Sequence, residues 1–206
     1  GQSREELFGC NAAIVAQCAR DAAKYAPGSI IVVVTNPLDM MVYAALQASG
    51  FAKERVIGMA GELDGARLKF ELARASGKEI SSMRSAIVGP HSEEMIALKN
   101  ELGFEISDEI FERAVQNTKR AGAQIGELLG TSAYLAPAAG IVKIIKYILF
   151  DTCGTLACCV ADRSGVPLGR FVSVGKMGAI ERNFAYSGEF YAQLERMRES
   201  VAGLKF

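Results

Sequence analysis

Helical and strand-like hydrophobic patterns alternate along the first part of the chain. The first predicted helix ends near Pro27-Gly28, and its predicted buried face consists of Leu7, Ile14, Val15, Cys18 and Ala22. Residues 30–35 are β-branched and apolar on both faces, which is typical of a central parallel strand. A helix over 38–48 and a short strand over 56–58 follow. This alternation predicts a doubly wound α/β unit.

Two asparagines interrupt this apolar pattern. Asn11 lies on the same predicted helix face as Leu7 and Cys18, so its amide needs a backbone partner or a ligand. Asn36 directly follows the predicted strand. In doubly wound sheets ligands bind beyond the carboxyl ends of the strands, so Asn36 falls where a ligand is expected.

The second part of the chain has a different order of elements. The pattern predicts a helix over 62–75, a strand over 83–88, a long amphipathic helix capped by Ser107 with apolar positions up to Leu129, and a buried helix within 138–150. Strands over 155–160 and 170–174 precede a final helix whose apolar face is Phe190, Leu194, Met197, Val201 and Leu204. The sequence therefore predicts an α/β region over 1–61 followed by an α+β region over 62–206.

Composition narrows the class of protein. Half of the 206 residues are hydrophobic and 22% are charged, which excludes a disordered chain. The 23 basic residues balance the 23 acidic ones and form no basic block, which argues against nucleic acid or a membrane as a partner. No apolar run reaches the roughly 20 residues of a membrane span.

Five cysteines, an odd number without framework spacing, indicate reduced thiols and a cytoplasmic protein. Cys158 and Cys159 are adjacent in a predicted strand and therefore point to opposite faces. With no histidine nearby in the sequence, packing explains this pair better than a metal does. We predict no metal site.

His91 is the only histidine and follows a predicted strand in a Gly-Pro turn. A lone histidine is by default a surface or satisfied core residue. Asp64 and Arg67 are three residues apart and share a helix face, which by default means an intrahelical ion pair. The alternative is that Asp64 orients a histidine while Arg67 holds a carboxylate with its planar fork. Spacing alone leaves both readings open.

Three ordered motifs stand out: Val-Val-Thr-Asn-Pro-Leu-Asp at 33–39, Val-Ile-Gly-Met-Ala-Gly-Glu-Leu-Asp-Gly-Ala-Arg at 56–67, and Val-Gly-Pro-His at 88–91. Together they resemble the NAD-dependent lactate/malate dehydrogenase family. Weaker similarity extends from Gly1-Gln2-Ser3-Arg4 to a late hairpin at 171–180. The resemblance implies the second half of a Rossmann-type doubly wound parallel sheet, over 1–61, followed by an α+β substrate and catalytic domain over 62–206.

The resemblance implies a role for each matched residue. His91 would be the catalytic acid/base, held by Asp64. Arg67 and Arg4 would bind substrate carboxylate or carbonyl groups, and Asn36 would contact substrate and cofactor. Asn11, Val34 and Thr35 would border the cofactor, which is NAD.

The implied substrate is a small 2-hydroxy or 2-oxo acid. Gly-Met-Ala-Gly-Glu-Leu-Asp at 58–64 and Ala-Pro-Ala-Ala at 136–139 are more similar to the malate branch, with lactate or another 2-hydroxy acid as the alternative. A homo-oligomer, dimer or tetramer, is implied as well.

The chain also departs from the family pattern. The Gly-x-Gly-x-x-Gly phosphate loop, its strand, the ribose-binding acid and the first substrate arginine would precede residue 1, so we expect a fragment or processed chain. Ser92-Glu93 replaces Gly-Asp after the histidine, and Pro90 removes a backbone donor before it.

Two other functions stay open at this point. The first is a truncated or diverged family member without independent activity, acting as an oligomerising or binding module. The second is another α/β enzyme that uses Asp64 and His91 differently, which would need a nucleophile poised beside His91. Ser92 is adjacent to it in the chain but belongs to no nucleophile motif.

Overall fold

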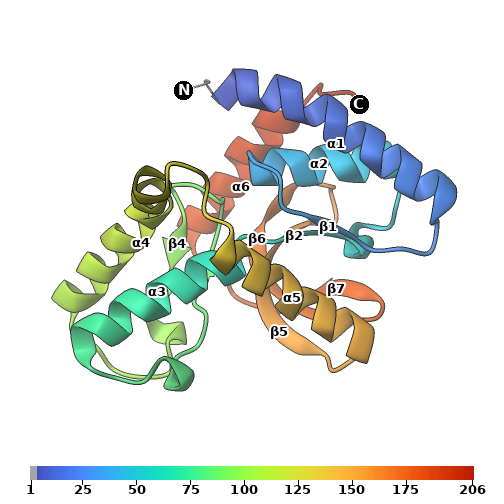
Figure 1. Ribbon diagram of the computed structural model, residues 1–206. Helices are drawn as coiled ribbons and strands as arrows, with labels where there is room; N and C mark the ends of the chain where they lie inside the picture. The colour runs from blue at the N-terminus through green and yellow to red at the C-terminus, as the bar shows by residue number, and fades with distance from the viewer. Residues whose placement is uncertain (1–3) are drawn as a thin grey trace.

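The computed structural model describes residues 4–206, with side chains from Phe8 onward. The described helices are α1 (Arg4–Tyr25), α2 (Leu38–Ser49), α3 (Gly61–Ser76), α4 (Asp108–Leu129), α5 (Leu135–Phe150) and α6 (Gly188–Val201) (Figure 1). The strands are β1 (Ile31–Val33), β2 (Val56–Gly58), β3 (Ile87–Val88), β4 (Ile96–Ala97), β5 (Gly154–Ala161), β6 (Pro167–Gly175) and β7 (Gly178–Glu181).

One five-stranded sheet has the order β1-β2-β5-β6-β7. β1 and β2 are parallel, as predicted, and β5, β6 and β7 form an antiparallel meander. The two parts meet where Gly58 of β2 pairs with Cys159 of β5. A Cβ at Gly58 would lie 2.9 Å from the Cys159 Cβ, so only glycine allows this approach. The predicted regions 1–61 and 62–206 thus contribute strands to the same sheet.

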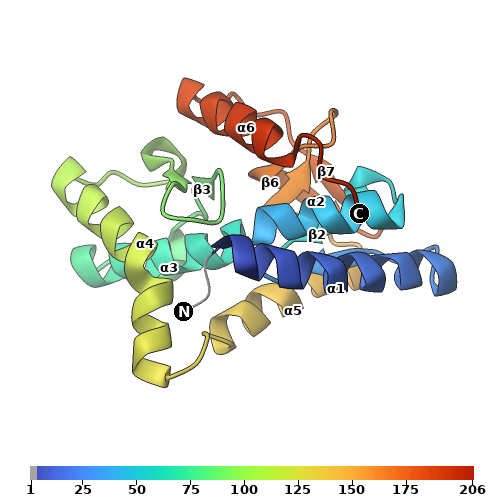
Figure 2. The same cartoon turned by 90° about the horizontal axis from the view of Figure 1, so that it is seen from above.

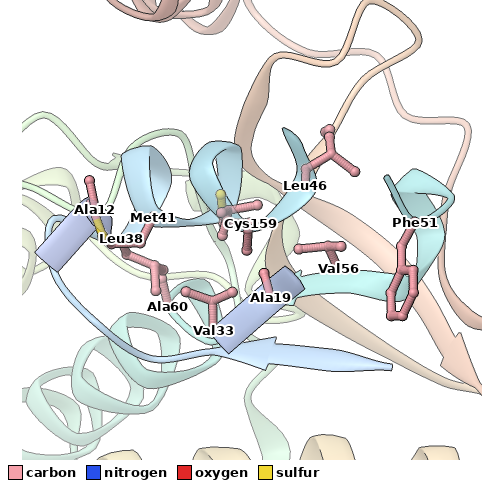
Figure 3. Packing of buried hydrophobic residues seen from close by; sticks show 13 residues of the cluster. Ala12, Ala19, Val33, Leu38, Met41, Leu46, Phe51, Val56, Ala60 and Cys159 are labelled. Atoms are coloured by element: carbon pink, nitrogen blue, oxygen red, sulfur yellow. The ribbon is translucent and has the colours of Figure 1, made fainter. Parts of the chain in front are cut away.

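Helices cover both faces of this sheet. α1 and α2 lie together on one side and α5 on the other (Figures 1 and 2). Cys159 packs in the α1/α2 cluster with Val33, Met41 and Val56 (Figure 3). Cys158 packs on the opposite face with Ile57 and Ile144. The prediction that the two cysteines point to opposite faces and serve packing is confirmed.

The predicted buried face of the first helix is wrong at two positions. Ile14 is 62% exposed and Cys18 is exposed, whereas Ala12, Ala16 and Ala19 are buried. The reason is that α2 runs alongside α1 (Figure 2), and small side chains let two helices approach closely. The side chain of Leu7 lies outside the described residues.

Two predicted strands are shorter or differently placed than expected. β1 is the edge of the described sheet rather than a central strand, because it pairs with β2 alone among the described strands. The strand predicted over 83–88 is reduced to Ile87–Val88. The residues before it form no strand. Instead, the Arg84 N–H donates to the Leu102 carbonyl, and the Ala86 carbonyl accepts from the Leu98 N–H.

The helix predicted as buried within 138–150 is amphipathic instead. Gly140 and Ile144 are buried, but Val142, Ile145, Leu149 and Phe150 are exposed. The long helix α4 behaves similarly: it is capped by Ser107 as predicted and packs Ala114 on α3, but Leu128 and Leu129 near its end are exposed. Only one face of each helix meets the described chain, which hydrophobicity alone does not reveal.

Candidate active site

The segment that carries His91 is fixed at its start. Gly89 and Gly169 of β6 exchange two backbone hydrogen bonds, of 2.8 and 3.0 Å. Gly89 has a φ of 86°, and a Cβ at Gly169 would lie 2.4 Å from the Gly89 carbonyl oxygen. Both positions therefore require glycine, one for the backbone conformation and one for the close approach. This contact sets where the chain leaves β3 and turns toward α3.

The His91 imidazole meets the first turn of α3. Its Nδ1 lies 2.7 Å from Asp64 Oδ2, and the Asp64 side chain is 2% exposed. The other carboxylate oxygen, Oδ1, accepts from an Arg67 guanidinium nitrogen at 3.3 Å. Both readings of the spacing are therefore correct in part: Asp64 forms the intrahelical pair with Arg67 and also holds the histidine.

The guanidinium of Arg67 retains hydrogen-bonding capacity. Its Nε is buried and has no partner among the described residues. A Cβ at Gly122 of α4 would lie 3.5 Å from one guanidinium nitrogen, so a glycine of α4 lies directly against this group. A buried guanidinium donor without a partner fits an oxygen acceptor such as a carboxylate.

A second carboxylate meets the same histidine from α2. Asp39 Oδ2 accepts the His91 backbone N–H at 2.9 Å. Asp39 is 7% exposed, and its burial raises the pKa of the carboxyl above its usual value. No sequence motif assigned a role to Asp39. A signal was present, because it is an acid in the otherwise apolar run of α2 with Leu38, Met41 and Val42.

The surroundings of His91 favour its charged form. Burial acts to lower the pKa of His91, and so does the charge of Arg67. The hydrogen bond and charge of Asp64, aided by the charge of Asp39, raise it by more. The pKa therefore lies above its usual value, so more imidazolium is present near neutrality than in a free histidine.

The residues expected to border the cofactor lie at the carboxyl end of β1. Val34, Thr35 and Asn36 are exposed there. Asn11 of α1 donates from its side-chain amide to the Asn36 carbonyl oxygen at 2.8 Å. Asn36 thus provides the backbone partner of the Asn11 amide. Asn11 and Asn36 are in contact, whereas the side chain of Arg4 lies outside the described residues.

A cavity of about 920 Å³ is lined in part by His91. It is bounded by α1 at Phe8, by Asn36 and the start of α2, by the segment 90–92, and by α6. His91 and Asn36 both line it, whereas Asp64 and Arg67 do not. From α6, Gln193 donates to the Glu94 carbonyl oxygen at 2.6 Å, a contact that sequence reasoning missed.

The part of the chain that the structure describes contains no group of three or more His, Cys, Asp or Glu side chains arranged to hold a metal ion. Within the same residues, no helix is both long and apolar enough to cross a membrane.

Two family models match the chain in succession. The model of the lactate/malate dehydrogenase NAD-binding domain matches residues 1–58, and that of the α/β C-terminal domain matches residues 61–179. The chain belongs to the lactate/malate dehydrogenase family. The resemblance drawn from the three sequence motifs is confirmed, and so is the α/β fold class with its NAD-binding and C-terminal parts.

Individual relatives place the chain in the malate dehydrogenase branch. The malate dehydrogenase of Nitratiruptor sp. is 40% identical over 193 residues, covering 88% of this chain and 61% of the relative. That of Flavobacterium johnsoniae is 38% identical, covering 99% of this chain and 70% of the relative. The solved malate dehydrogenase of Plasmodium falciparum in complex with NADH matches with a TM-score of 0.86 at 26% identity, covering 93% of this chain and 69% of that one. The chain thus spans 61 to 70% of these relatives' lengths.

Proposed function

We propose that the protein is an NAD-dependent malate dehydrogenase that interconverts malate and oxaloacetate, with His91 as its acid/base. The observation that carries the proposal is the 2.7 Å contact between His91 Nδ1 and the buried Asp64 carboxylate. This contact fixes the proton on Nδ1 and leaves Nε2 free to exchange a proton with substrate. A pKa near the working pH suits that exchange.

In malate oxidation, His91 Nε2 takes the proton of the C2 hydroxyl as the C2–H bond breaks and the carbonyl of oxaloacetate forms. When bound, the nicotinamide would accept the hydride that leaves C2. Asp64 stabilises the imidazolium that results, because its charge lies against Nδ1. In the reverse direction the same imidazolium returns the proton to the developing alkoxide.

Arg67 binds a substrate carboxylate in this proposal. Its guanidinium is held by Asp64 through one nitrogen, and its Nε is unpartnered. A planar guanidinium matches a carboxylate with two parallel donors, which also orients the substrate. We assign Arg4 to a second substrate carboxylate or to the reacting carbonyl, and Asn36 to substrate and cofactor, on the family motifs.

The cofactor is NAD in this proposal. The family model that matches residues 1–58 describes an NAD-binding domain, and the related Plasmodium enzyme is in complex with NADH. Val34, Thr35 and Asn36 are exposed at the carboxyl end of β1, which fits a nicotinamide riboside lying over them. Asn11 would act through its contact with Asn36.

An alternative is a family member without independent activity that serves as an oligomerising or binding module. The full-length protein decides between the two. We expect oxaloacetate-dependent oxidation of NADH, with pyruvate and NADPH as much poorer substrates. Faster reduction of pyruvate would point to lactate as the physiological substrate. Absence of activity with both acids would favour the binding module.

The proposal extends to the oligomeric state of the protein. Exposed apolar residues lie near the end of α4 and along one face of α5. Exposed apolar patches of this kind favour association. These residues are Leu128, Leu135, Val142, Ile145, Leu149 and Phe150. We therefore propose a homo-oligomer, dimer or tetramer, tested by sedimentation of the full-length protein. The cysteine content supports a cytoplasmic location.

A further inference from the structure

Asp39 is the feature of the site to which the sequence motifs gave no role. It lies in the first turn of α2, and its Oδ2 accepts the His91 N–H at 2.9 Å. Its Oδ1 is buried without a hydrogen-bond partner among the described residues, and the Cys159 thiol of β5 lies beside the carboxylate. A carboxylate is costly to bury unless its oxygens are paired, so its presence at this position calls for a role.

The backbone of the His91 segment depends on this contact. Gly89 uses its N–H on Gly169, and Pro90 has no N–H to donate. The His91 N–H is therefore the next donor after the Gly89–Gly169 contact, and Asp39 accepts it. The imidazole of His91 is held by Asp64 of α3, while its main chain is held by Asp39 of α2. Two carboxylates from two helices thus fix one residue.

We propose that Asp39 is a positioning residue for His91, which fixes the main chain of the catalytic segment and favours the imidazolium by its charge. The proposal rests on the proposed role of His91 as acid/base. The charged groups that face His91 are Asp64 and Arg67 from α3 and Asp39 from α2. The group that faces Asp39 from β5 is Cys159, whose pKa burial and Asp39 raise, so the thiol stays neutral.

The single histidine makes a direct test possible. In protein labelled with ¹³C-histidine and purified with a histidine-free tag, the one imidazole signal belongs to His91. In Asp39→Asn the amide oxygen can still accept the His91 N–H, but the charge is gone. We expect the titration midpoint of His91 to fall, because the charge of Asp39 is one of the groups that raise it.

A matched control removes a charge from the same segment. Glu93 is exposed, so Glu93→Gln should shift the midpoint much less, because solvent screens its charge. An unchanged midpoint in Asp39→Asn, or equal shifts in the two variants, would overturn the proposal. The titration needs neither substrate nor cofactor, so it stands even if the protein lacks malate dehydrogenase activity.

A measurement on the unmodified protein covers the case in which Asp39→Asn does not fold. With ¹⁵N-histidine the spectrum contains one backbone amide signal, that of His91. A hydrogen bond to a buried carboxylate predicts slow exchange of this amide with solvent. Exchange as fast as in an unfolded chain would overturn the proposal. In the full-length enzyme, the pH profile of kcat/KM for oxaloacetate reduction should move to lower pH in Asp39→Asn, because that direction requires the imidazolium.

Discussion

Substitution of Arg67 distinguishes a purely structural role of this side chain from a role in substrate binding. Arg67 forms an ion pair with Asp64. If this pair is its only role, Arg67→Lys keeps the charge and changes the free energy of unfolding by no more than about 0.5 kcal/mol. If Arg67 also grips a carboxylate, lysine lacks the second parallel donor. Loss of one charge-assisted bond of about 1.5–3 kcal/mol lowers kcat/KM for oxaloacetate about ten- to a hundredfold.

Steady-state kinetics and a thermal melt of the full-length Arg67→Lys protein check this prediction together. The affinity for NADH should not change, because in the proposed complex the guanidinium contacts substrate and not the cofactor. A lower melting temperature with unchanged kcat/KM would return Arg67 to a purely structural role.

The raised pKa of His91 gives a pH dependence of stability with a definite sign. Asp64 and Asp39 raise this pKa in the folded state above the unfolded value of about 6.5. The stabilisation that results is fully present below pH 6.5 and is lost as pH rises through the folded pKa. We expect Asp64→Asn to lower the His91 midpoint and to weaken this dependence, as measured by urea unfolding between pH 5.5 and 8. A midpoint equal to that of the unmodified protein would contradict the Asp64 contact.

At the scale of elements, the site depends on close contact between α3 and the segment before β3. A Cβ at Gly65 would lie 1.8 Å from Ser85 Oγ, 3.0 Å from Ser85 Cβ and 3.4 Å from Ser85 Cα. Rotating the serine side chain relieves only the first of these contacts, so Gly65→Ala pushes the two elements apart. We expect a loss of about 1–3 kcal/mol in the free energy of unfolding.

Gly126→Ala is the matched control, because it lies in helix α4 and its nearest atom would be 3.8 Å away. It should be neutral or slightly stabilising, since alanine favours a helix over glycine. Chemical denaturation of both variants gives the comparison. Adding Ser85→Gly to Gly65→Ala should restore the lost stability, because it removes the side chain that the new methyl group meets. Equal stability of the two alanine variants would show that the α3 contact is looser than the structure has it.

Much of the element order could be predicted from the sequence, because local patterns carry it. The cap at Ser107 and the apolar face of α6 follow from positions near one another in the chain, and the parallel pair β1 and β2 follows from the alternation of helix and strand. The buried face of α1 could not be predicted, since which side is covered depends on α2. Asp39 was missed for the same reason, because its partner His91 is 52 residues away in sequence.

For the site, the spacing along the chain connected Asp64 with Arg67 but left His91 apart, and the family resemblance linked His91 to Asp64. The structure brings His91 onto Asp64, as that resemblance implied, and pairs Asp64 with Arg67, as their spacing on one helix face indicated. The contact of Asn11 with a backbone carbonyl was one of the two outcomes expected for a polar group on a buried face.

At the scale of the whole molecule, the 206 residues hold the proposed nicotinamide end of a cofactor site but no Gly-x-Gly-x-x-Gly run for the pyrophosphate. We therefore expect the isolated 206-residue chain to bind NADH more weakly than micromolar, as measured by isothermal calorimetry. The full-length protein is the comparison. Micromolar binding by the isolated chain would show that its own residues suffice for the cofactor.

The most direct test of the account is the replacement of His91 by asparagine in the full-length protein. Asparagine is close in size and polar, but its amide cannot take up the substrate proton and return it as an imidazole does. We expect kcat for oxaloacetate reduction to fall by about two to four orders of magnitude while the affinity for NADH is retained. Turnover within a few-fold of the unmodified protein would contradict the role of His91 as acid/base.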